Sequence, residues 1–100
     1  MLVFDEIVTG FRINKGGAQT FFKVTPDLSC FGKAMGNGMP ISALVGKKQY
    51  MKKFNDVFYA MNFVGEKASL AAAKVTLDYY LKNDVAKEIN KKGNFLSTRL

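Results

Sequence analysis

The pattern of apolar and polar residues predicts strands in the first half of the chain and longer helices in the second half. Apolar runs at residues 1–4, 28–31 and 41–45 stop abruptly at a charged residue or a glycine, as short strands do. The run at residues 1–4 is apolar at every position, which indicates a strand buried on both faces of a parallel sheet. Residues 18–23 and 48–54 predict short helical segments, whereas the aromatic-rich residues 57–63 predict a strand or an extended segment.

Residues 67–81 carry the strongest helical signal in the chain. Leu70, Ala73, Leu77 and Leu81 recur at helical spacing, and three consecutive alanines favour a helix. Asp84 then provides an N-cap for a second helix that runs toward residue 100. The strands and helices together predict an α/β fold.

Two glycine-rich connections interrupt the strands. Residues 9–17 contain three glycines, and residues 32–40 contain three glycines and a proline, so neither stretch is expected to be a regular element. Such loops often carry functional side chains because they lie where strands end.

The composition removes most catalytic classes. The chain has no His and a single Cys, which excludes a Ser-His or Cys-His pair, a His metal ligand and an internal disulfide within its 100 residues. No metal site is therefore expected. The single Cys and the absence of a signal-peptide pattern at the N-terminus predict a cytoplasmic location.

The net charge of +7 raises the question of a polyanionic partner. The lysines are spread along the chain without a run of five or six like charges, so solvated helix faces are the favoured interpretation. We expect no nucleic-acid partner and no membrane span; a basic binding module and an inactive fragment are kept as distant alternatives.

One lysine and one carboxylate remain as candidates for chemistry. Lys33 follows the second strand within a glycine-rich loop, and Asp5 follows the first strand. The residue after Lys33 is Ala34, where a nucleotide-binding P-loop requires Ser or Thr. A lysine amine can form a Schiff base with a carbonyl or with pyridoxal phosphate, whose ring nitrogen needs an acidic partner.

Several motifs in a fixed order resemble one family. Residues 4–12 read Phe-Asp-Glu-Ile-Val-Thr-Gly-Phe-Arg and are similar to the Asp-Glu-x-x-Thr-Gly-Phe-Arg stretch of class III pyridoxal-phosphate aminotransferases. Gly-Gly-Ala-Gln at 16–19, Thr-Pro-Asp-Leu at 25–28 and the glycine-rich residues 32–40 follow in that family's order. The first two of these segments resemble the glutamate-1-semialdehyde aminomutase branch in particular.

The resemblance implies a fold and a set of roles. It implies part of the large domain of fold type I enzymes, which is a mostly parallel sheet with flanking helices. Lys33 would form the Schiff base with pyridoxal phosphate and then carry the proton, Asp5 would pair with the ring nitrogen, and Ile7 would pack on the ring. Glu6 and Arg12 receive no catalytic role and are expected to be members of structural ion pairs.

The second half of the chain decides between two activities of the family. Asn62 stands where the family has a Thr that reaches the cofactor phosphate of the neighbouring subunit, and Gly65-Glu66 matches aminotransferase variants of the following turn. We therefore expect a transaminase acting on a small amino donor and a carbonyl acceptor, as a homodimer, with glutamate-1-semialdehyde 2,1-aminomutase as the alternative. Residues 1–100 would form a single partial domain, inactive alone, in which residues 84–100 would begin the connection toward a small domain.

Overall fold

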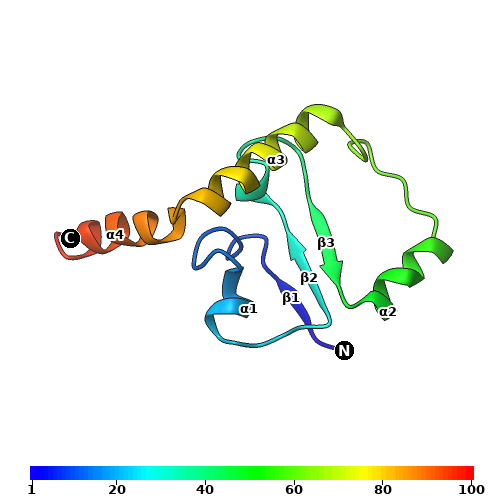
Figure 1. Cartoon of the computed structure of the whole chain (residues 1–100), viewed down its shortest axis with the longest axis horizontal. Helices are drawn as coiled ribbons and strands as arrows, with labels where there is room; N and C mark the ends of the chain where they lie inside the picture. Colours follow the sequence, from blue (N-terminus) through cyan, green and yellow to red (C-terminus); the bar gives the residue numbers. More distant parts are fainter.

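Three short strands form one mixed sheet. In the computed structural model, which describes residues 1–100, β1 (Val3–Asp5) pairs in parallel with β2 (Leu28–Phe31), and β2 pairs antiparallel with β3 (Ala43–Gly46) (Figure 1). All three predicted strands are confirmed. The sheet is less parallel than expected, because the connection from β2 to β3 holds only the 3₁₀ turn η1 (Lys33–Met35) and not the helix that usually carries a parallel crossover.

The burial predicted for the first strand is wrong. Val3 is 46% exposed and Phe4 is only half-buried. The reason is that β1 packs extensively against β2 alone, at the edge of the sheet, and lacks the helices that cover the faces of a buried parallel strand.

The helices lie close to where the sequence predicts them. They are α1 (Gly17–Phe21), α2 (Lys48–Met51), its 3₁₀ continuation η2 (Lys52–Asp56), α3 (Lys67–Lys82) and α4 (Val85–Ser97). Asp84 caps α4, since its carboxylate accepts a hydrogen bond from the backbone N–H of Lys87 at 3.3 Å. Residues 57–66 form no strand and arch away from the sheet as an extended segment that ends in turns (Figure 1).

The face of α3 that packs inward differs from the leucine stripe. Ser69 and Ala73 are buried, whereas Leu70, Leu77 and Leu81 are exposed. Small residues on the inward face bring the helix close to η1, with which it makes contact. The spacing therefore predicted the helix correctly but did not identify its buried side.

A small apolar core joins η1, α3 and the loop after β1. Phe11, Met35 and Ala73 form its buried centre, with Phe31 and Tyr80 packed around it. The ring of Phe11 makes edge-to-face contacts with both of these aromatic rings, at centroid distances of 6.0 and 5.3 Å. The Tyr80 hydroxyl also donates a hydrogen bond to the Phe11 carbonyl at 2.6 Å, which fixes α3 to the loop.

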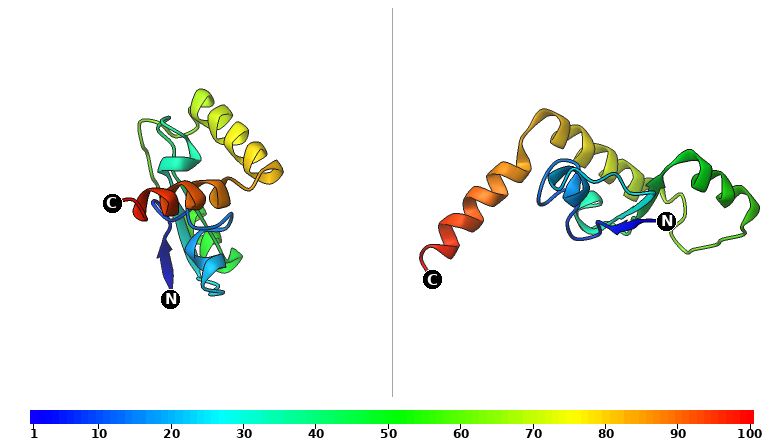
Figure 2. Two further views of the ribbon diagram at one scale, coloured as in Figure 1. Left: turned by 90° about the vertical axis from the view of Figure 1, so that its left-hand side faces the viewer. Right: turned by 90° about the horizontal axis from the view of Figure 1, so that it is seen from below.

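The chain is elongated, with principal extents of 52 × 32 × 26 Å. Figure 1 and the right-hand view of Figure 2 show α4 projecting away from the rest of the molecule toward the C-terminus. None of the helices combines the length and the apolar character that a membrane span requires.

Candidate active site at the carboxyl ends of β1 and β2

The parallel pairing of β1 and β2 brings two of the expected site residues to one edge of the sheet. Asp5 is the last residue of β1 and is in register with Cys30 of β2. The ladder continues one step further, because the backbone N–H of Glu6 donates to the Cys30 carbonyl at 2.9 Å. Lys33 follows three residues after Cys30, so the carboxylate of Asp5 and the amine of Lys33 belong to the ends of adjacent strands.

Ile7 follows the end of β1 and lies against the residue that follows β2. Its side chain packs against Gly32, where an added Cβ would lie 3.7 Å from Cγ2 of Ile7. Its backbone N–H donates to Oδ1 of Asp5 at 2.9 Å. The structure thus connects Asp5, Ile7 and the residue that precedes Lys33.

The backbone of Lys33 has an unusual conformation. Its φ of 38° lies in the left-handed region, which a residue with a side chain adopts at a cost and which is enriched at functional sites. The turn is held by hydrogen bonds from the N–H groups of Gly36 and Asn37 to the Lys33 carbonyl. Met35, two residues later, is buried in the core and anchors the same turn, while the Lys33 side chain stays exposed.

Gly36 is required by the packing of this loop. An added Cβ would lie 2.6 Å from the Met39 carbonyl oxygen and 2.5 Å from Cγ2 of Ile41. The loop itself therefore demands glycine here, in addition to any requirement for space beside a ligand.

Asn62 lies apart from the other three expected residues. It is exposed within the segment of residues 57–66, which Figure 1 shows curving away from the carboxyl ends of the strands. None of the hydrogen bonds in the structure joins its side chain to Asp5, Ile7 or Lys33.

Glu6 has a role that the sequence did not reveal. Its side chain is only 1% exposed, and its carboxylate accepts hydrogen bonds from the Thr9 hydroxyl and from the backbone N–H groups of Ala18 (2.8 Å) and Gln19 (2.7 Å) in α1. Burial alone would raise the pKa of Glu6, but these three hydrogen bonds outweigh burial and hold the pKa below its usual range.

The glycine at the start of α1 leaves room for this carboxylate. Gly17 has a φ of 76°, and an added Cβ would lie 2.7 Å from the Cδ of Glu6. The Gly-Gly-Ala-Gln motif therefore has a structural meaning, since it places two N–H donors against Glu6.

The expected structural ion pairs of Glu6 and Arg12 are absent. The charge of Glu6 is stabilised by N–H and O–H donors, and the ion pairs of the structure involve Asp27 and Lys74 with their partners rather than the exposed Arg12. The sequence signal for this role is that Glu6 directly follows Asp5. Successive residues of a strand point to opposite sides, so two adjacent acids at a strand end are expected to have different surroundings.

Glu66 is the N-cap of α3. Its carboxylate accepts from the backbone N–H groups of Ala68 and Ser69 and from the Ser69 hydroxyl, at 2.6–2.8 Å. The hydrogen bond from the Ser69 hydroxyl, followed by the two N–H donors, lowers the pKa of Glu66. The Glu66 carboxylate thus caps the N-terminus of α3.

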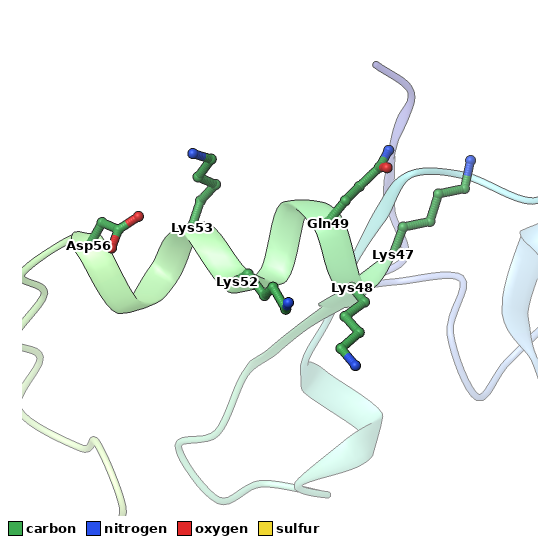
Figure 3. Close-up of a pocket in the computed structure, with 6 residues that line it drawn as sticks. All are labelled: Lys47, Lys48, Gln49, Lys52, Lys53 and Asp56. Atoms are coloured by element: carbon green, nitrogen blue, oxygen red, sulfur yellow. The ribbon is translucent and has the colours of Figure 1, made fainter.

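A hollow of about 680 Å³ lies elsewhere, along α2 and η2. Four lysines, one glutamine and one aspartate line it, with no apolar side chain among them. In Figure 3 these side chains diverge from the helix rather than converge on a common point. The arrangement does not resemble an enclosed ligand site, and no group of three or more acidic or Cys side chains in the chain is placed to hold a metal ion.

Comparison with known proteins assigns the fold and the family. The family model described as "Aminotransferase class-III" matches residues 1–100. A curated glutamate-1-semialdehyde 2,1-aminomutase from Syntrophobacter fumaroxidans is 41% identical over 96% of this chain. The chain covers 23% of that relative, so it spans about a quarter of the length of the curated proteins it matches.

Solved structures agree with this assignment. The FumI protein of Sphingopyxis sp., solved in an internal-aldimine form with pyridoxal phosphate, is 38% identical and superposes with a TM-score of 0.71 over 76% of this chain and 18% of its own. An S-selective transaminase from Arthrobacter sp. shares the fold, with a TM-score of 0.73 over 99% of this chain and 24% of its own at 21% identity. The chain therefore belongs to the class III aminotransferase family, and the cofactor that this family implies is pyridoxal phosphate.

Proposed function

We propose that this chain carries the reactive lysine of a pyridoxal-phosphate-dependent transaminase, with Lys33 as that lysine. The observation that carries the proposal is the juxtaposition of the Lys33 and Asp5 strand ends, with Ile7 packed against Gly32. Ligands of open α/β sheets bind at the carboxyl ends of the strands, which is the edge these residues occupy.

The chemistry of these side chains fits the cofactor. Asp5 uses Oδ1 to accept the Ile7 N–H, whereas its Oδ2 has no hydrogen-bond partner in the chain. The exposed amine of Lys33 takes part in none of the ion pairs. An available carboxylate oxygen, an available amine and an apolar side chain are the three groups that a pyridoxal ring requires.

Each residue would then have one task. Pyridoxal phosphate, when bound, supplies a ring that accepts the electron pair left behind when a substrate carbon loses its proton. Lys33 would hold the cofactor and then move that proton, and the Asp5 carboxylate would keep the ring nitrogen protonated. Ile7 would cover one face of the ring and exclude water from it.

The proposal extends to a larger protein. Because the chain spans only about a quarter of its curated relatives, residues 1–100 would be one part of a large domain, with residues 84–100 leading toward a small domain. Asn62, on its separate segment, would contact the cofactor phosphate of a second copy in a homodimer. We also propose a cytoplasmic location, with a small amino donor and a carbonyl acceptor as substrates.

An aminomutase is the second candidate function. The curated relatives at about 40% identity bear the name glutamate-1-semialdehyde 2,1-aminomutase, which favours it. The Gly65-Glu66 pair favours a transaminase, because it matches the aminotransferase variants of this turn better than the aminomutase turn. Incubating the full-length protein with glutamate-1-semialdehyde separates the two: 5-aminolevulinate formed without an external amino acceptor would establish the aminomutase.

The identity of the lysine is tested by reduction. Full-length protein incubated with pyridoxal phosphate and treated with borohydride should carry the label on the peptide that contains Lys33. Lys33→Ala should abolish the label, whereas Lys23→Ala should retain it. Lys23 is a matched control because it is also exposed and also has a positive φ, of 56°. A label on any other lysine would overturn the assignment.

A further inference from the structure

The buried carboxylate of Glu6 is the one titratable group in the core that the proposed chemistry leaves unused. Every hydrogen bond that Glu6 makes is to the chain itself. Its N–H donates to Cys30, its carbonyl accepts from Gly10 at 2.8 Å, and its carboxylate accepts from the Thr9 hydroxyl and from α1. The residue is therefore fixed at its backbone and at its side chain.

The two neighbours of Glu6 are the residues expected to face the cofactor. Asp5 precedes it and Ile7 follows it, and the two are linked to each other by the hydrogen bond from the Ile7 N–H to Asp5 Oδ1 at 2.9 Å. Any rotation of the peptide units around Glu6 moves both of them. Without the Glu6 side chain, the segment would lose its hydrogen bonds to Thr9 and α1 and would keep only the backbone hydrogen bonds of Glu6 and the end of a three-residue edge strand.

Only an ionised carboxylate matches the groups around Glu6. Two of its three partners are backbone N–H groups, which can only donate, and the third is a hydroxyl that donates here. An amide in the same place would present an NH₂ group to at least one donor. The buried N–H opposite it would then lose its acceptor, which destabilises that arrangement.

We infer that Glu6 is a positioning residue, which holds the Asp5–Ile7 segment in the orientation that binds pyridoxal phosphate by fastening it to Thr9 and α1. This inference rests on the proposed function, since it acts through Asp5. A positioning role explains why the buried acid Glu6 stands beside the exposed acid Asp5. It also gives the Gly17 turn a function, because the glycine leaves space for the carboxylate and directs two N–H groups toward it.

The test measures pyridoxal phosphate affinity in a double-mutant cycle on the full-length protein, well below every melting temperature. We expect Glu6→Gln to raise the Kd about tenfold, the size of one weakened charged hydrogen bond. In an Asp5→Ala background the same change should raise the Kd less than about twofold, because the group it positions is gone. Equal effects in the two backgrounds, or no effect in either, would overturn the inference.

Asp27→Asn is the matched control for a loss of stability. Asp27 accepts a backbone N–H from Leu2 and an ammonium hydrogen bond from Lys47, both at 2.7 Å, at the opposite end of the same two strands. The control should lower the melting temperature but leave the Kd unchanged. A Kd raised as much by Asp27→Asn as by Glu6→Gln would show that stability alone accounts for the effect and would refute the inference.

A second measurement needs no cofactor. Hydrogen exchange on the cofactor-free protein should show faster exchange at the amides of Ile7, Ala18 and Gln19 in Glu6→Gln than in the wild type, while Asp27→Asn leaves them unchanged. Unchanged exchange in Glu6→Gln would contradict the positioning role. If the wild type fails to bind pyridoxal phosphate, the proposed function fails instead, and the exchange result still decides whether Glu6 fixes the segment.

Discussion

The exposed surface of this chain predicts how residues 1–100 behave when they are produced alone. The accessible surface is 7687 Å², against about 5,700 Å² expected for a folded monomer of 11.1 kDa. The radius of gyration is 15.3 Å, compared with about 13 Å for a typical domain of 100 residues. The chain therefore leaves about 2,000 Å² uncovered that a monomer of its mass would bury.

That surface corresponds to a large free energy. If about 55–60% of it is apolar, at about 25 cal/mol per Å², the chain forgoes about 25–30 kcal/mol of hydrophobic stabilisation. The net stability of a domain is only about 5–15 kcal/mol. The buried apolar core, with Phe11, Met35 and Ala73 at its centre, is too small to compensate. We expect residues 1–100 alone to show no cooperative unfolding transition.

Circular dichroism and dye binding check this expectation. Residues 1–100 alone should retain helical far-ultraviolet signal, melt gradually over a broad temperature range and bind a hydrophobic dye. The full-length protein, in which other segments can cover side chains such as Phe58 (93% exposed), is the control and should melt cooperatively. A single sharp transition and no dye binding for residues 1–100 would refute the reasoning from exposed surface.

Three further predictions concern the full-length protein. Tyr80→Phe keeps the ring contacts but removes the 2.6 Å hydrogen bond to the Phe11 carbonyl, so urea denaturation should show a loss of about 1–1.5 kcal/mol; an unchanged midpoint would contradict this. Gly17→Ala should lower the unfolding free energy more than Gly65→Ala, although both glycines have φ near 75°, because only at Gly17 does the new Cβ meet the Glu6 carboxylate. Equal losses of unfolding free energy would show that only the backbone conformation matters. Folding lowers the pKa of Glu6, so the ionised Glu6 carboxylate stabilises the folded state fully above the unfolded pKa of about 4.3. This stabilisation is lost as the pH falls through the lower pKa of the folded state. The unfolding free energy should therefore fall less steeply with decreasing pH in Glu6→Gln than in the wild type.

Local signals in the sequence predicted the elements of this fold well. The strand at residues 28–31, the helix that begins at Lys67 and the N-cap at Asp84 all depend on neighbouring residues, and the structure has each of them. The carboxyl ends of β1 and β2 also meet as expected for a parallel pair. These features follow from periodicity, capping and glycine placement, which a single sequence displays.

Features that depend on distant residues could not be read in the same way. The hydrogen bond from Tyr80 to Phe11 joins residues 69 positions apart and ties α3 to the loop after β1. The direction of β3 depends on how the loop after β2 packs, with Met35 in the core and Gly36 against Ile41. No local pattern encodes such contacts, because each requires two segments to be brought together first.

The adjacent acids at the end of β1 illustrate how the structure separates roles that the sequence leaves equal. Asp5 and Glu6 have the same charge and stand at the end of the same strand, but they face opposite environments. Both oxygens of Glu6 accept hydrogen bonds from the chain and are buried, so a ligand cannot reach this carboxylate. Asp5 keeps one oxygen free and stays exposed, so it can accept a hydrogen bond from a ring nitrogen. The satisfied acid can stabilise only the chain, and the unsatisfied acid is the one available for chemistry.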